Sequence, residues 1–131
     1  MKRDMDLIRA LLLKLEALPM RPGGIVHITA ADEEVAVPGK TVDEIDYHLS
    51  QIENSGYIDT GGVNPMEGIG FRCLTWPGHD FVDSVRDDAI WHEAKEGAKK
   101  AGGFSLELLG ALAKGLIKKK IEQHTGVDID L

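Results

Sequence analysis

Four stretches of the chain carry apolar residues at steps of three and four, the spacing that places side chains on one face of an α-helix. They span about residues 4–18, 41–55, 75–101 and 105–125. Glycine-containing turns separate them, and the short segments left between them have the residue types of β-strands. A chain of 131 residues is long enough to bury a hydrophobic core. We therefore predict an α+β fold that is mostly helical.

The second of these helices has the clearest boundaries. Thr41 is a favourable N-cap, and Glu44 stands three residues later, which predicts a capping box. Gly56 follows the last apolar position and predicts the end of the helix. In the same way, Ser105 and Gly126 predict the two ends of the last helix.

Short strands are predicted between the helices, at residues 25–29, 57–59 and 71–75. Residues 35–37 also alternate, so for the segment 30–38 we favour a small hairpin over a short helix. The glycine-rich segment 61–70 is too long for a tight turn and predicts an extended wing between two strands.

Two motifs within this order resemble a known fold. The segment from Tyr47 through Gly56 to Ile58 is similar to the end of the recognition helix and the start of the wing in many winged-helix regulators. Residues 74–81, Leu-Thr-Trp-Pro-Gly-His-Asp-Phe, resemble the exit from that wing. The resemblance implies a winged-helix-like domain with a glycine-rich wing hairpin over residues 1–101. Residues 102–131 would add an apolar and basic helix that packs on the domain or on a second subunit.

A second resemblance covers most of the chain. Residues 1–8, 45–49 and 86–91 look like the uncharacterised bacterial and prophage family called domain of unknown function 2513. That family supplies no established activity and no catalytic residues. The resemblance therefore implies a bacterial or phage context, and fold analogy alone does not give a function.

The net charge of −7 is unevenly distributed. Residues 22–71 contain nine acidic residues and a single basic one, Lys40. The helix 41–55 has no Lys or Arg, although a winged helix that reads DNA inserts this element into the major groove. Its acidic residues are either a solvated face or a face that contacts a protein partner, and DNA reading by this helix is disfavoured. This acidic face comprises Asp43, Glu44, Asp46 and Glu53.

The last helix combines a leucine-rich face with a cluster of lysines. The lysines complement the helix dipole and add solubility, or alternatively contact phosphates or form part of an amphipathic helix at a membrane surface. They are Lys114, Lys118, Lys119 and Lys120. The apolar face either packs on the first helix or forms a homodimer, and we expect the homodimer. Its expected interface residues are Leu108, Leu109, Leu112 and Leu116.

The sequence contains no catalytic or metal-binding motif. Cys73 is the single cysteine, which excludes a disulfide within the chain, and we expect it to be buried and unreactive. Two Asp/His pairs at helical spacing, Asp88 with His92 and His79 with Asp83, each offer two ligands, whereas a zinc site needs three or four. We therefore predict no catalytic residue, no metal and no cofactor.

The large aromatic side chains are expected to be structural. Trp76, Phe81 and Trp91 are expected in the core rather than on a base-stacking platform.

No apolar run reaches the ~18–20 residues of a membrane span, and the N-terminus lacks an apolar signal core. We expect no membrane partner and a cytoplasmic location, in keeping with the reduced state expected of a lone cysteine.

These observations favour a non-enzymatic winged-helix-like module of phage or mobile-element type that acts through protein–protein contacts and self-association. Its protein partner is not indicated by the sequence. One alternative is a DNA-binding transcriptional regulator that uses the wing, residues 61–70, and the terminal lysines. A third is a nucleic-acid mimic whose acidic surface occupies the basic channel of a partner.

Overall fold

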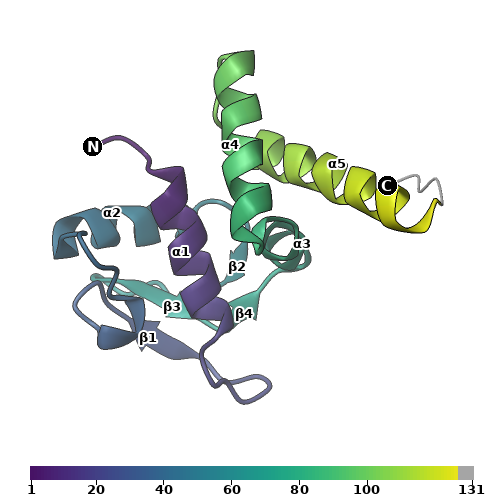
Figure 1. Cartoon of the computed structure of the whole chain (residues 1–131). Helices are drawn as coiled ribbons and strands as arrows, with labels where there is room; N and C mark the ends of the chain where they lie inside the picture. Colours follow the sequence, from purple (N-terminus) through teal and green to yellow (C-terminus); the bar gives the residue numbers. More distant parts are fainter. Residues whose placement is uncertain (127–131) are drawn as a thin grey trace. The chain divides into compact units, whose positions relative to one another are not determined.

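The structure, a computed structural model, describes residues 1–126 (Figure 1). Five α-helices and four short strands follow one another in this described part. In chain order, the elements are α1 (Met5–Glu16), β1 (Val26–Ile28), the 3-10 helix η1 (Glu33–Val35), α2 (Val42–Glu53), β2 (Ile58–Asp59), β3 (Ile69–Phe71), β4 (Cys73–Leu74), α3 (Trp76–Val85), α4 (Asp88–Ala101) and α5 (Leu106–Thr125). The predicted α+β, mostly helical fold is confirmed.

The chain forms two compact units. One runs from Met1 to His79, and the other begins at Asp80, so the boundary lies within α3. This division differs from the predicted boundary at residue 101, because α4 packs with α5 in the second unit.

The helices of the first unit begin and end where local residue chemistry predicts. Asp4 is the N-cap of α1, and its side chain accepts a hydrogen bond from the Leu7 N–H. Thr41 and Glu44 form the predicted capping box at the start of α2. Each helix buries one apolar face. The buried residues of α1 are Leu7, Ile8, Leu11, Leu12 and Leu15, and those of α2 are Ile45, His48, Leu49 and Ile52.

The strands form two small antiparallel pairs that share one segment of chain, residues 69–74. β3 pairs with β1, with Ile28 opposite Ile69 and Val26 opposite Phe71. β4 pairs with β2, with Ile58 opposite Leu74. The backbone N–H of Arg72, between β3 and β4, donates to the Asp59 carbonyl. One continuous segment therefore connects both early strands, and the glycine-rich segment leaves β2 and returns through β3 and β4.

The small hairpin favoured for residues 30–38 is wrong. The Asp32 carboxylate accepts a hydrogen bond from the Thr29 N–H at 2.9 Å, and η1 follows directly. Val35 of η1 is fully buried, and η1 contacts α1. This local side-chain bond favours a turn, because Asp and Ser/Thr side chains compete with strand pairing for backbone groups.

The single helix predicted over residues 75–101 is divided into α3 and α4. Asp87 is the N-cap of α4, and its carboxylate accepts from the Ile90 N–H at 2.9 Å. Phe81 and Trp91 are buried, as predicted, and their rings meet edge to face with centroids 6.3 Å apart.

Trp76 contradicts the prediction of a core position, because its side chain is 82% exposed. His79, Asp80 and Asp83 follow Trp76 on the same face of α3 and are exposed as well. Trp76 therefore lies on the outer face of that helix.

In the second unit, α5 packs against α4. Ser105 caps its start by accepting from the Leu108 N–H, and Gly126 ends it in the left-handed conformation, as predicted. The residues of α5 that are fully covered are Leu109, Gly110 and Ala113.

Candidate functional site

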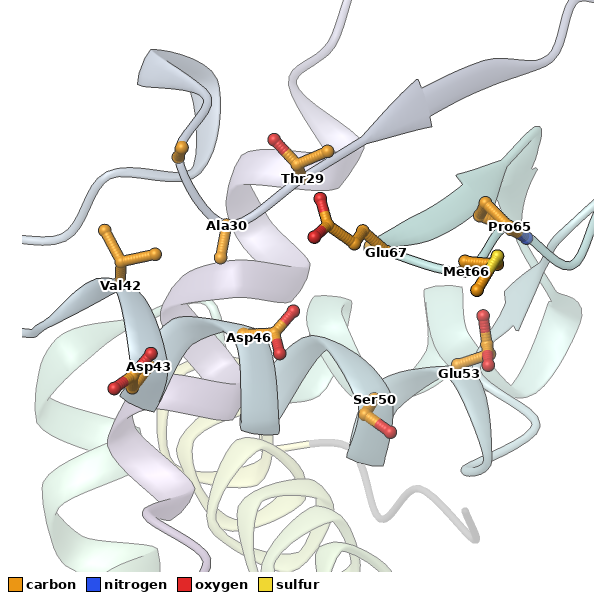
Figure 2. Close-up of a pocket in the computed structure, with 12 residues that line it drawn as sticks. Thr29, Ala30, Val42, Asp43, Asp46, Ser50, Glu53, Pro65, Met66 and Glu67 are labelled. Carbon is orange, nitrogen blue, oxygen red and sulfur yellow. The ribbon is translucent and has the colours of Figure 1, made fainter.

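The first unit contains a groove that we take as the candidate functional site and call the acidic groove (Figure 2). Its volume is about 430 Å³, within the roughly 300–1,000 Å³ that is typical of ligand-binding clefts. Residues 29–31, 65–68 and the outer face of α2 form its walls. The residues from α2 are Val42, Asp43, Asp46, Ser50 and Glu53.

Four carboxylates line the acidic groove, and none of the described residues that line it is basic. Asp43, Asp46 and Glu53 come from α2, where steps of three and seven residues keep them on one side of the helix. Glu67 comes from the facing loop, and its carboxylate lies between Thr29 and Asp46 in Figure 2. The groove therefore has a concentrated negative potential on both walls.

The structure brings together three of the four acidic residues that the sequence analysis assigned to this face. Glu44 is the exception, because its carboxylate closes the capping box with Thr41 and lies 4.0 Å from the Lys40 ammonium.

Lys40 also bonds the Asp4 carboxylate at 2.8 Å. Burial opposes ionisation of Asp4, but the hydrogen bonds from Lys40 and from the Leu7 N–H outweigh it and lower the pKa of Asp4.

The facing loop was not part of the predicted site. Glu67 belongs to the acidic block of residues 22–71, and Met66, which is fully exposed, has no sequence signal of a binding residue. The loop is fastened to β1, because a ring nitrogen of His27 bonds the Glu67 carbonyl at 2.6 Å. Gly68 also contacts β1, since a Cβ at this position would lie 2.0 Å from the Ile28 carbonyl oxygen. These contacts join residues about forty positions apart, which sequence spacing does not show.

The base of the glycine-rich segment is held by a local ion pair. The Arg72 guanidinium bonds the Asp59 carboxylate, with Nε at 3.1 Å from Oδ2. The Gly61 N–H and Arg72 both donate to Asp59, and they lower the pKa of its carboxyl. Arg72 therefore has a structural partner within the unit.

The lysines of α5 do not lie on a single face. Lys114 and Lys118 are one turn apart, whereas Lys119 and Lys120 are rotated from Lys118 by about 100° and 200° around the helix. Lys118 also lies 3.9 Å from the Glu122 carboxylate. The four residues thus carry positive charge to several sides of α5.

The leucines assigned to a dimer interface have unequal exposure. Leu109 is fully buried, so it does not reach the surface of the second unit. Leu108, Leu112 and Leu116 are partly exposed and follow one another at steps of four along a flank of α5. These three leucines are the part of the predicted interface that is accessible.

The structure corrects the prediction for Cys73, which is exposed rather than buried. Its neighbour Leu74 is buried, and side chains alternate between the two faces of a strand, so Cys73 points away from the core.

Among residues 1–126, no three His, Cys, Asp or Glu side chains are placed to hold a metal ion. Within the same part of the chain, no helix has the length and hydropathy needed to cross a membrane.

Comparison with known proteins identifies the family. Residues 2–105 match the family model described as "Hypothetical protein (DUF2513)". The chain belongs to the DUF2513 family. A relative from Haemophilus influenzae (strain ATCC 51907 / DSM 11121 / KW20 / Rd), described as "Uncharacterized protein", is 32% identical over 127 residues. The match covers 92% of this chain and 99% of that relative. No solved structure matches this DUF2513 chain.

Proposed function

We propose that this DUF2513 chain is a non-enzymatic, winged-helix-like module that acts through contacts with a protein partner and through self-association. The order of α2, β2, a glycine-rich segment and the returning β3 and β4 supports the winged-helix part of the proposal. We place the module in the bacterial cytoplasm, as an accessory protein of phage or mobile-element type.

The observation that carries this proposal is the acidic groove. In a winged helix that reads DNA, the element in the position of α2 offers donors to base edges and cations to phosphates. Here the outer face of α2 carries Asp43, Asp46 and Glu53 into a groove that also contains Glu67. Four carboxylates would repel a phosphate backbone, whereas they would attract the basic side chains of a protein.

The alternative of a DNA-binding regulator needs cations elsewhere in the molecule. The wing, residues 61–70, contains no Lys or Arg, and the nearby Arg72 is paired with Asp59. The lysines of α5 are spread around the helix rather than gathered on one surface. These observations favour a protein partner over DNA.

A photo-crosslinking experiment tests the protein-binding part of the proposal. We expect p-benzoyl-L-phenylalanine at Ser50, which lines the acidic groove, to crosslink a discrete protein in bacterial cells that express the chain. The same amino acid at Glu93, an exposed position on α4, is the control and should give no such product. Crosslinking of nucleic acid from Ser50, or equal protein products from both positions, would contradict the proposal.

Self-association is tested separately, through the exposed leucine flank of α5. We expect the purified chain to be a dimer by light scattering at micromolar concentration, because a row of leucines loses unfavourable water contact when a second copy covers it. Leu116→Lys should give a monomer, whereas Ala111→Lys, which adds the same charge at an exposed position of α5, should stay dimeric. A monomeric native chain would rule out this part of the proposal.

A further inference from the structure

Strand β1 has one edge that no strand of the described chain covers. β3 pairs with β1 on one side, and these two strands form a separate two-stranded sheet (Figure 1). In an antiparallel pair, residues alternate between one that bonds the partner strand with its backbone groups and one that directs them away. The Ile28 carbonyl points toward β3, because a Cβ at Gly68, just before β3, would collide with its oxygen. The N–H and C=O of His27 therefore point to the uncovered edge, where no described residue bonds them.

A groove of about 320 Å³ lies along this edge, and we call it the β1 groove. All three residues of β1 line it, although the side chains of Val26 and Ile28 point to one face of the strand and that of His27 to the other. A groove that reaches residues of both faces follows the edge of a strand. Since β3 occupies one edge, the β1 groove follows the other.

The backbone of β1 indicates that the occupant is an extended segment of chain. Unpaired N–H and C=O groups at a sheet edge are a template for one more strand. An added strand would bond His27 with both backbone groups of the residue opposite. The residues before and after that one would direct their side chains to the face of Val26 and Ile28.

The lining of the β1 groove indicates which side chains the segment carries. Val26 is 38% exposed, and the other apolar lining comes from residues 18–20, Leu-Pro-Met, so one side chain of the segment should be apolar. Asp32 and Glu34 line the groove beyond the end of β1, and none of its described lining residues is Lys or Arg. A basic side chain at that end complements their charge.

We propose that the β1 groove binds an extended segment of a protein partner, which adds to β1 as an antiparallel strand and places one basic and one apolar side chain in the groove. The antiparallel direction follows from the greater stability of that pairing per residue. This inference rests on the proposed protein-binding function, but it uses a second surface, since the β1 groove and the acidic groove share no lining residue.

The test uses NMR spectroscopy of the full ¹⁵N-labelled chain with the peptide Gly-Ser-Lys-Thr-Val-Ser-Gly. In the antiparallel register, the central threonine lies opposite His27, the lysine lies toward Asp32 and the valine lies opposite Val26. We expect saturable shifts of the His27 amide. N-methylation of the threonine removes the donor to the His27 carbonyl and should weaken binding about tenfold. N-methylation of the valine, whose N–H points away from β1, should weaken binding less than threefold.

His27→Pro makes the corresponding change on the chain. Proline removes the N–H that points to the uncovered edge, and proline is tolerated in an edge strand at such a position, so the pairing of β1 with β3 should survive. We expect peptide binding to weaken about tenfold. His27→Thr is the control, because it loses the ring and its bond to the Glu67 carbonyl but keeps the N–H, and it should change binding less than threefold. Amide spectra without peptide show whether both variants are folded, and the two N-methylated peptides decide the question if His27→Pro is not.

Three results would each overturn the inference: no shift of the His27 amide, equal weakening by the two N-methylations, or equal weakening by folded His27→Pro and His27→Thr. Conversion of a native dimer into a monomer by His27→Pro, without peptide binding, would assign the edge to a second copy and would also overturn it. If the Ser50 crosslink persists in those cases, the protein-binding function stands and only strand addition fails. If the crosslink is absent while the peptide binds, the acidic groove fails as the contact surface and strand addition at β1 stands.

Discussion

Replacing Gly68 by alanine is expected to destabilise the first unit by about 3 kcal/mol or more. Gly68 has a φ of +73°, and a Cβ there would lie 2.0 Å from the Ile28 carbonyl oxygen. The oxygen is a backbone atom and the backbone fixes the position of the Cβ, so no side-chain rotation relieves the clash. The loop must separate from β1, and the wall of the acidic groove that contains Met66 and Glu67 separates with it.

Gly62→Ala is the matched control for this prediction. Gly62 lies in the same glycine-rich segment with a φ of +78°, but a Cβ there has nothing within 4 Å. Its replacement therefore costs only the strain of a left-handed alanine, about 1 kcal/mol. Urea denaturation followed by circular dichroism measures both variants. Equal costs for the two substitutions would show that Gly68 is needed for its φ alone and not for contact with β1.

The same variants connect stability to the acidic groove. Gly68→Ala should reduce the protein crosslink from Ser50 more than Gly62→Ala does, because only Gly68→Ala moves the wall that carries Met66. This comparison uses two chains of equal charge.

Features set by neighbouring residues were predictable from the sequence. Thr41 with Glu44, Ser105 and Gly126 mark helix ends through bonds that span at most four residues, and all of these ends are confirmed. The acidic residues of α2 could be placed on one face for the same reason, since helical spacing determines which side chains are neighbours. Asp87 has a similar signal, an N-cap before Ile90, but the apolar spacing on both sides of it predicts one continuous helix.

Features set by distant pairing were not predictable. Residues 69–74 pair with β1 in their first half and with β2 in their second half, and nothing local to β1 indicates that partner. Residues 35–37 alternate like a strand, but no neighbouring strand is available to them, and η1 forms instead. Glu67 faces α2 only because Gly68 and His27 hold its loop against β1. Half of the acidic groove therefore depends on contacts that leave no periodic pattern in the sequence.

Glu44 and Glu53 of α2 also differ in how their carboxylates are packed and bonded. Glu44 and Glu53 were both assigned to one partner-binding face from their spacing. In the structure, the Glu44 carboxylate accepts the Thr41 N–H in the capping box at the N-terminus of α2. Glu53, at the other end of the helix, has a buried oxygen without a donor. A carboxylate that already has its bonds contributes little to a new partner. Glu44 therefore lies outside the acidic groove, whereas Asp43, Asp46 and Glu53 line it along the length of α2.

His48 connects the start of α1 to α2 through hydrogen bonds at both ring nitrogens. Its side chain is 2% exposed, and its Nε2 accepts a hydrogen bond from the Asp4 backbone N–H at 2.8 Å. The ring must then carry its hydrogen on Nδ1, which donates to the Glu44 carbonyl at 2.7 Å. Because Asp4 is the N-cap of α1, this one ring fixes the start of α1 to the middle of α2.

His48→Phe is expected to lower the free energy of unfolding of the first unit by about 2–3 kcal/mol. Phenylalanine keeps a ring of similar size but offers no acceptor, so the Asp4 N–H is left without its partner. Urea denaturation gives the stability, and amide hydrogen exchange of Asp4 should become faster in the variant than in the native chain. His27→Phe is the control, since His27 is exposed and makes one bond to the Glu67 carbonyl, and it should cost less than about 1 kcal/mol. If both variants lose the same stability and the Asp4 amide exchanges at its native rate, then the buried bond between His48 and Asp4 does not hold the two helices together.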